Sequence, residues 1–165
     1  MTSRLKVTEI ADPTNGNTAI SIDTGGVVTQ PKKVRFIARG NDDSYVATAP
    51  VPFPTVEQNV GGGYNSSTYK FTCPVAGTYM FQANFGIIRI DTSGNYGYVS
   101  LMKNDVTQFY AYEQVPSATA YHSASMNIML ECAVGDVIHV NFNRSGTATY
   151  YNDAAETWFS GYLLA

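Results

Sequence analysis

Charged side chains are scarce in this sequence. Asp, Glu, Lys and Arg make up 14% of the 165 residues, and the formal net charge is −3 at pH 7. Proteins that bind nucleic acid without sequence preference need a basic surface that neutralises phosphates. We therefore expect no nucleic-acid partner.

Long hydrophobic runs are also missing, although a membrane helix needs roughly 20 consecutive apolar residues. The first residues, MTSRLKVTEIADPTNG, have no apolar stretch typical of a signal peptide, so we expect no membrane partner and no processing. The two cysteines, Cys73 and Cys132, are too few for a disulfide scaffold. The sequence leaves two alternatives for these cysteines, which are two buried free thiols or a disulfide bond between them.

Patterns that indicate catalysis or ligand chemistry are absent. His122 and His139 are the only histidines, and no GxSxG nucleophile motif occurs. No cysteine pair has zinc spacing, Asp42–Asp43 and Asp91 lack the EF-hand pattern, and the glycines at 61–63 are not followed by Lys-Ser/Thr. We predict no catalytic residue, no cofactor and no metal site, and hence a protein that is not an enzyme.

Alternation of apolar and polar residues, which is typical of β-strands, covers nearly the whole chain. Turn-forming residues such as GNDDS, PVAG, KND and AVGD separate the strand-like runs. The predicted strands are Leu5–Ile10, Ala19–Ile22, Val34–Arg39, Thr68–Cys73, Thr78–Phe85, Tyr96–Met102, Val106–Tyr112, Ser123–Cys132, Val137–Phe142 and Thr157–Leu164. Many short strands at this spacing predict an all-β sandwich, jelly roll or barrel.

The last predicted strand, TWFSGYLLA, is apolar on both faces. One parity carries Phe159 and Leu163, and the other carries Trp158, Tyr162 and Leu164. In an antiparallel sandwich only one face of a strand meets the partner sheet. A neighbouring subunit is the simplest cover for the second face, and a loop of the same chain is the alternative. The pattern does not say which parity faces a subunit.

Several motifs together resemble the globular domain of the complement component 1q and tumour necrosis factor superfamily. The motifs are VRFIAR, PFPTVEQNVGGGY, YKFTCPVAGTYMF, VSLMKND, VGDVIHV and the closing WFSGYLLA. The most specific residues are Phe71, Cys73, Pro74, Gly77, Tyr79, Phe81, Gly135, Asp136, Phe159, Gly161 and Leu163. The resemblance implies a ten-stranded jelly-roll sandwich over residues 34–165 that forms a homotrimer with its last strand near the threefold axis. It gives these residues scaffold roles, with Tyr79, Phe81 and Phe159 in the core.

Residues 1–33 precede this predicted head. TNGNTAISIDTGGVV resembles short N-terminal and inter-domain pieces of bacteriophage fibre and virion proteins, where an Asn-Gly turn leads into an alternating strand. Seven apolar side chains in this segment have no evident place in the core of the head: Leu5, Val7, Ile10, Ile20, Ile22, Val27 and Val28. We expect them to attach an extended N-terminal arm to neighbouring arms or to a capsid surface.

These inferences lead to a hypothesis of function. The protein is expected to be a non-enzymatic virion structural protein of a tailed bacteriophage, a trimeric capsid decoration or cement protein on the capsid surface, with the major capsid protein or another virion component as partner. A short fibre or head-fibre tip that binds a host receptor, and a non-viral complement 1q-like ligand-binding trimer, are the alternatives. Tyr150 and Tyr151 could recognise a receptor or glycan, or simply pack on the sheet rim; Tyr110 and Tyr112 leave the same choice.

Overall fold

A computed structural model describes residues 7–11, 14, 16, 18–41, 43–45, 49–90, 95–114, 120–146 and 148–165. In these residues every regular element is a β-strand. The chain divides into two compact units, Met1–Lys33 and Val34–Ala165. We refer to the first unit as the arm and to the second as the head.

The arm contains a small antiparallel sheet of strands β1 (Glu9–Ala11), β2 (Thr18–Ile22) and β3 (Val28–Thr29), in that order. Ile10 pairs with Ile20, and Ser21 pairs with Thr29. The predicted run Ala19–Ile22 lies within β2, whereas the predicted run Leu5–Ile10 shares only Glu9 and Ile10 with β1. The third strand has two residues, which is too short to show an alternating pattern.

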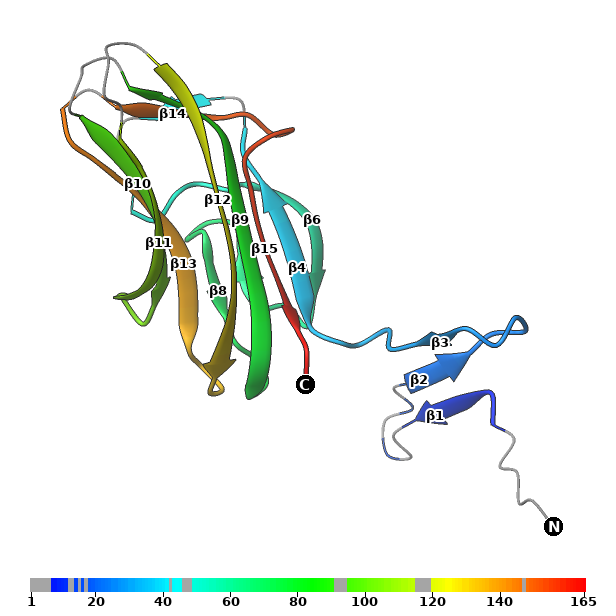
Figure 1. Cartoon of the computed structure of the whole chain (residues 1–165). Helices are drawn as coiled ribbons and strands as arrows, with labels where there is room; N and C mark the ends of the chain where they lie inside the picture. The colour runs from blue at the N-terminus through cyan, green and yellow to red at the C-terminus, as the bar shows by residue number, and fades with distance from the viewer. Residues whose placement is uncertain are drawn as a thin grey trace. The chain divides into compact units, whose positions relative to one another are not determined.

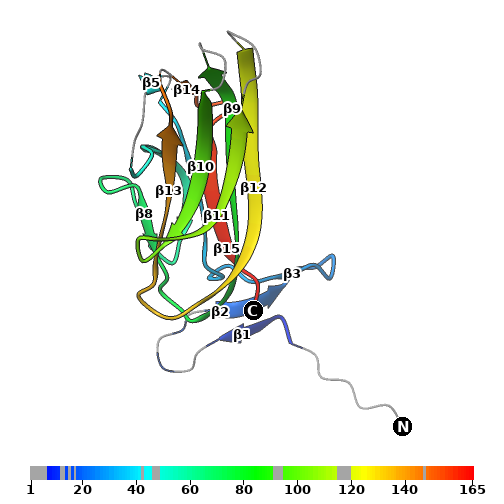
Figure 2. The same cartoon turned by 60° about the vertical axis from the view of Figure 1, so that its left-hand side comes forward.

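The head is a sandwich of two sheets, which face each other in Figures 1 and 2. The first, which we call the β9 sheet, has the order β5-β14-β9-β15-β4-β6, with β12 on the other edge of β9. Its strands are β4 (Arg35–Arg39), β5 (Asp43–Tyr45), β6 (Thr55–Val60), β9 (Gly77–Ile90), β12 (Ala120–Cys132), β14 (Thr149–Asn152) and β15 (Trp158–Leu163). The second, the β10 sheet, has the order β11-β10-β13-β8-β7. Its strands are β7 (Tyr64–Asn65), β8 (Lys70–Thr72), β10 (Tyr96–Lys103), β11 (Val106–Gln114) and β13 (Val137–Arg144).

The all-β jelly-roll prediction is confirmed by this architecture. In the described residues the head has twelve strands, two more than the ten that the resemblance implies. Two of the twelve, β5 and β7, contain three and two residues and lie in stretches that the sequence marks as turns. Strand β6 escaped prediction because its sequence, TVEQNV, is mostly polar and lies at a sheet edge.

Strand β9 organises its sheet because it pairs along both edges. One edge pairs with β12 from Gly77 to Ile90. The other edge is shared, since β15 pairs with Tyr79–Asn84 and β14 pairs with Ile87–Arg89. A Cβ atom at Gly86, between these two segments, would lie 2.4 Å from Cβ of Glu156, so the chain between β14 and β15 passes close to β9 at this point.

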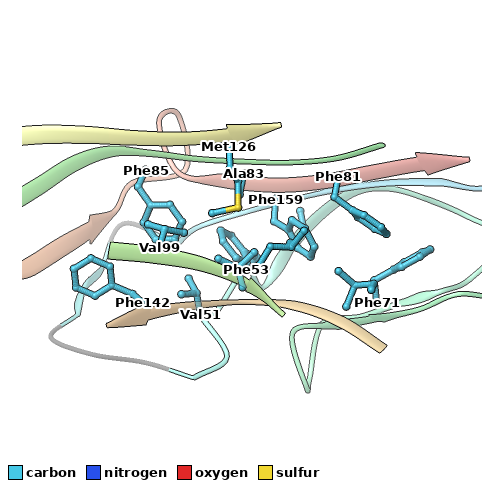
Figure 3. Close-up of a cluster of buried hydrophobic side chains, with 14 of the residues drawn as sticks. Val51, Phe53, Phe71, Phe81, Ala83, Phe85, Val99, Met126, Phe142 and Phe159 are labelled. Carbon is cyan, nitrogen blue, oxygen red and sulfur yellow. The ribbon is translucent and has the colours of Figure 1, made fainter. Parts of the chain in front are cut away.

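The core is a layer of aromatic and aliphatic side chains between the sheets (Figure 3). Phe36 stacks on Phe71 with ring centroids 4.6 Å apart and meets Phe159 edge-on at 4.9 Å. Phe71, Tyr79, Phe81 and Phe159 are completely buried, which confirms the predicted core roles of Tyr79, Phe81 and Phe159. Burying each of these side chains stabilises the fold by roughly 1.5–3 kcal/mol.

Two turns show why particular residues occupy them. Asn104 and Asp105 both have positive φ, 52° and 62°, and join β10 to β11 as a two-residue hairpin loop of the kind that fits the strand twist. Gly135 has φ of 87° in the turn before β13, where a side chain would be strained. These positions match the predicted KND and AVGD turns.

Replacing Gly161 by Ala is expected to destabilise the head by about 1–3 kcal/mol. A Cβ atom there would lie 2.6 Å from Cε1 of Phe36 and 2.7 Å from Cδ1 of Phe81, and both rings are held inside the core. Urea unfolding followed by circular dichroism measures the change. Thr72→Ala, at an exposed position of β8, is a control that should stay within about 0.5 kcal/mol of the unaltered protein. Equal stability of the Gly161 variant would show that the packing of β15 is looser than described.

Candidate binding surfaces

The structure resolves which parity of the last strand faces the core. Phe159 and Gly161 are buried between the sheets, and Leu163 packs against the same core. Trp158 and Tyr162 have the opposite parity, so they lie on the outer face of the β9 sheet, where Trp158 is half-buried and Tyr162 is 40% exposed. Leu164 follows the strand, is half-buried, and its N–H donates to the carbonyl oxygen of Thr78 at 2.8 Å. The five predicted residues thus divide between core and surface.

The outer face of the β9 sheet carries an apolar row across three strands. Tyr162 of β15 pairs with Met80 of β9, which pairs with Met129 of β12. Met129 is 61% exposed, which is unusual for a large apolar side chain in the middle of a long strand. The neighbouring row is polar and internally satisfied, since Gln82 Nε2 donates to Asn127 Oδ1 at 2.6 Å. Exposed apolar side chains beside satisfied polar ones make this face a candidate for an assembly contact.

The suggestion that Tyr150 belongs to a recognition loop is wrong. Tyr150 lies in strand β14, is completely buried, and its ring contacts Phe142 at 4.8 Å and Phe85 at 5.2 Å. Tyr151, on the opposite parity, is half-buried, and its carbonyl oxygen accepts a hydrogen bond from Thr157 Oγ1. The sequence TATYYND resembles a loop because it is short and flanked by Gly and Asp, and only the pairing with β9 reveals a strand.

A second cluster of tyrosines does reach the surface, on the outer face of the β10 sheet. Tyr96 and Tyr98 of β10 lie beside Tyr110 and Tyr112 of β11, with neighbouring ring centroids between 5.2 and 6.3 Å apart. Together with Thr107 they line a hollow of about 510 Å³. The sequence offered one signal for this cluster, since each strand carries tyrosine at two alternate positions and therefore on one face.

The apolar residues of the arm differ in exposure. Val7, Ile10, Val27 and Val28 are exposed, whereas Ile20 and Ile22 in the central strand are half-buried. Leu5 lies outside the described residues. The exposed members are the ones with side chains free to contact a partner surface.

The two histidines lie on strands of different sheets. His139 is buried in β13, and burial, together with the nearby Lys70 ammonium, lowers the pKa of its imidazole. His122 lies on β12 in the other sheet. Among the residues that the structure describes, no group of three or more His, Cys, Asp or Glu side chains could hold a metal ion. Asp42 and Asp91 lie outside those residues.

Cys73 and Cys132 are both buried free thiols. A hydrogen bond between the two side chains and their burial raise the pKa of the Cys73 thiol. Of the two states that the sequence left open, the structure therefore has the free thiols. They pack as small apolar groups at one end of the core.

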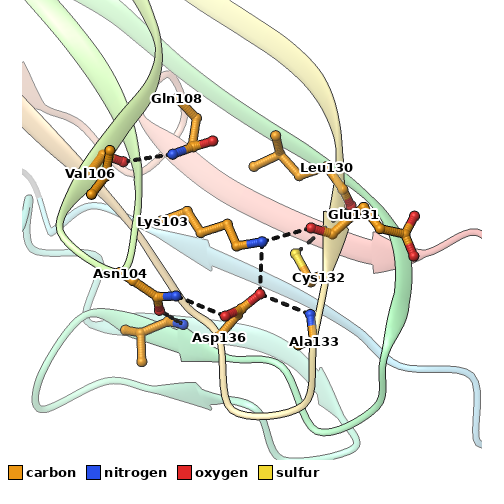
Figure 4. A network of polar contacts seen from close by, with 10 residues as sticks. Lys103, Asn104, Val106, Gln108, Leu130, Glu131, Cys132, Ala133 and Asp136 are labelled. Carbon is orange, nitrogen blue, oxygen red and sulfur yellow. Dashed lines mark hydrogen bonds and ion pairs between the residues drawn. The ribbon is translucent and has the colours of Figure 1, made fainter.

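A polar network closes this end of the sandwich around Asp136 (Figure 4). Its carboxylate lies 2.8 Å from Lys103 Nζ and accepts hydrogen bonds from Asn104 Nδ2 and from the N–H of Ala133, each at 2.8 Å. Lys103 Nζ also donates to the carbonyl oxygen of Glu131. The contact with Lys103 is the largest cause, and the hydrogen bonds from Asn104 and Ala133 the next, that lower the pKa of Asp136 to about 2. The network ties the turn after β10 to the turn before β13.

Comparison with known proteins agrees with this architecture. Residues 36–164 match the C1q domain family. The chain is 30% identical to Caprin-2 of Danio rerio over 115 residues, which cover 70% of this chain and 12% of that protein. It is also 30% identical to Complement C1q and tumor necrosis factor-related protein 9 of Mus musculus over 118 residues, which cover 70% of this chain and 33% of that protein. The chain thus spans a third or less of the length of these two relatives.

A solved structure shows the same fold. The globular domain of zebrafish complement 1qA superposes with a TM-score of 0.61, covering 81% of this chain and 98% of the other, at 17% sequence identity. Because the family match covers most of the head, the chain belongs to the C1q domain family. No helix in the described part of the chain is long and apolar enough to cross a membrane.

Replacing Asp136 by Asn is expected to lower stability at neutral pH and to flatten its dependence on acid. The folded pKa of about 2 lies below the ordinary 3.8, so the carboxylate stabilises the fold above pH 3.8, and this contribution is lost as the pH falls toward 2. Urea unfolding at several pH values measures the effect. Glu57→Gln is the control, because its ion pair with Arg39 is exposed and contributes about 0–1 kcal/mol. An unchanged acid profile in the Asp136 variant would contradict the assigned role of the network.

Proposed function

We propose that the protein is a non-enzymatic, homotrimeric binding head of the C1q type, and that its arm attaches the head to a larger assembly. The observation that carries the proposal is the apolar row on the outer face of the β9 sheet, formed by Tyr162, Met80 and Met129. In the monomer Tyr162 and Met129 leave 40% and 61% of their surface in water. Covering them with two other copies of the chain recovers roughly 25 cal/mol for each Å² of apolar surface removed from water.

The choice of a trimer rests on the family, and the choice of this face rests on the structure. C1q-type domains typically form homotrimers, and the last strand lies in the middle of the β9 sheet, between β4 and β9. Its outward-facing Trp158 and Tyr162 are therefore flanked by strands on both sides, with Ile37 of β4 half-buried on the same face. A broad face of this kind can pack around a symmetry axis.

Replacing Tyr162 by Glu is expected to convert trimers into monomers at micromolar concentration, because the charge would be buried without a partner in the contact. Sedimentation equilibrium should give three times 17.9 kDa for the unaltered chain and 17.9 kDa for the variant. Tyr110→Glu introduces the same charge at an exposed tyrosine of the β10 sheet and should leave the trimer intact. A monomeric unaltered protein, or a trimeric Tyr162 variant, would contradict the proposed interface.

The attachment role of the arm is supported by its size and its exposed apolar residues. A three-stranded sheet of this length buries few side chains, and Ile10, Val27 and Val28 are more than half exposed. Such residues on a small sheet are typical of a surface that completes its core on a partner. Among the described strands of this sheet, β1 and β3 are the edge strands, to which a partner strand could add.

The finer role proposed for this assembly is capsid decoration in a tailed bacteriophage. Its support is the resemblance of TNGNTAISIDTGGVV to virion-protein segments, and it stays a prediction, because the relatives described above are animal proteins and give it no support. A fibre tip would use the same arm and head. The relatives favour a third possibility, a ligand-binding trimer outside any virus.

Genes for a major capsid or portal protein next to this gene would favour a virion role. Mass spectrometry of purified virus particles then distinguishes the roles. Decoration predicts hundreds of copies per particle, and a fibre predicts tens. The double variant Ile10→Asp, Val28→Asp should abolish association with particles, whereas Val106→Asp, at an equally exposed valine of the head, should retain it. Absence of the protein from particles would rule out both virion roles and leave the soluble trimer.

A further inference from the structure

The tyrosine hollow on the β10 sheet is a second feature that the assembly role does not use. Sheet pairing builds it, because Tyr98 of β10 pairs directly with Tyr112 of β11, and Ser100 pairs with Tyr110. The intervening residues Val99 and Leu101 are completely buried in the core, so the tyrosines point away from the core. The position of the hollow is therefore set by two hydrogen-bonded strands rather than by a loop.

Among the residues that the structure describes, those that line the hollow are uncharged, and most of them are aromatic. The lining residues are Tyr96, Tyr98, Tyr110, Tyr112 and Thr107. Tyr110 and Tyr112 are 59% and 45% exposed, so their rings are open to a ligand. The volume of about 510 Å³ lies within the range of about 300–1,000 Å³ that small-molecule sites occupy. Each wall residue also carries a hydroxyl group that can donate and accept hydrogen bonds.

Polar side chains also lie on strand β13, which pairs with β10 on the edge opposite β11. Asn143 pairs with Tyr98 and donates from Nδ2 to Oγ of the buried Ser100 at 3.2 Å. Asn141 pairs with Ser100, and its buried Oδ1 has no hydrogen-bond partner among the described residues. The register places both asparagines on the outer face of the sheet, beside the tyrosines. An unsatisfied buried acceptor costs free energy unless a ligand or water hydrogen-bonds to it.

A further unsatisfied atom lies two residues along the same strand, on the same face. His139 pairs with Met102 and is 97% buried, with an exposed fraction of 3%. Its Nδ1 atom is likewise without a hydrogen-bond partner in the part of the chain that the structure describes. The outer face of the β10 sheet therefore combines aromatic rings with buried polar atoms that retain hydrogen-bonding capacity.

This chemistry narrows the class of ligand. A phosphate or another anion would need Lys or Arg, and the described residues that line the hollow include neither. A purely apolar ligand would take water from the tyrosine hydroxyls and give them no hydrogen-bond partner in its place. A sugar ring fits both requirements, because its C–H face packs on an aromatic ring while its hydroxyl groups take up hydrogen bonds at the edge.

We propose that the hollow formed by Tyr96, Tyr98, Tyr110 and Tyr112 binds an uncharged carbohydrate. The exposed rings of Tyr110 and Tyr112 supply the stacking surface, and the hydroxyl groups of the lining tyrosines supply hydrogen bonds. The inference deepens the binding role proposed above and rests on it. It does not depend on which larger assembly carries the arm.

The test is binding of the full-length protein to immobilised neutral glycans that end in glucose, galactose, mannose or N-acetylhexosamine. Soluble oligosaccharides of the bound type then give affinities by titration calorimetry. Tyr110→Ala is expected to weaken binding at least about tenfold, because it removes an exposed stacking ring. Tyr110→Phe keeps the ring and should therefore lose less binding affinity than Tyr110→Ala. Tyr121→Ala, at an exposed tyrosine of β12 in the other sheet, is the matched control and should bind like the unaltered chain.

Three results would overturn the inference. They are no binding to any neutral glycan, binding only to sialylated or sulfated glycans, and binding to a glycoprotein that survives enzymatic removal of its glycans. The last would identify a protein partner instead. Sedimentation of the same samples separates this test from the assembly proposal, since a trimer that binds no glycan overturns only the carbohydrate site.

Discussion

The packing of β15 between β4 and β9 is the contact on which the rest of the head depends. Gly161 lies against the rings of Phe36 and Phe81 because it has no side chain, and Phe159 meets Phe36 edge-on two residues earlier. The last strand can therefore lie flat in the middle of its sheet with hydrogen bonds along both edges. The same placement turns Trp158 and Tyr162 outward, so the core packing also defines the surface proposed for assembly.

The two proposed surfaces lie on opposite faces of the sandwich. Each sheet has one face on the shared core, which leaves one outer face per sheet. The outer face of the β9 sheet carries the Tyr162–Met80–Met129 row, and the outer face of the β10 sheet carries the tyrosine hollow. Assembly through the first face would leave the second open in every subunit. A trimer would then present three copies of the hollow, and weak binding at each could add up to firm attachment.

Much of the fold could be predicted from the sequence because most strands alternate cleanly between core and surface. Strands β6 and β14 could not, since β6 is polar along its length and the burial of Tyr150 in β14 depends on pairing with β9, which is distant in the sequence. The sequence also does not determine which face of the last strand points outward, because both parities are apolar. The close contact of Gly161 with the rings of Phe36 and Phe81 assigns its parity to the core. For the tyrosine hollow, the sequence shows that the two tyrosines of each strand share one face, because they stand at alternate positions. The register that brings Tyr98 opposite Tyr112 includes a bulge after Leu101, which the sequence does not reveal.

The polar character of β6 has a consequence for how copies of the head can meet. Among the described strands of its sheet β6 is an edge strand, to which a strand of another molecule could add. Its exposed side chains include Glu57, whose carboxylate pairs with Arg39, and Gln58, which accepts a hydrogen bond from Arg35. Charged and amide groups along an edge discourage the strand-by-strand growth that produces fibrils. The side chains of β6 therefore disfavour open-ended ribbons built by edge-to-edge pairing and leave the faces of the sheets as the surfaces for contact between copies.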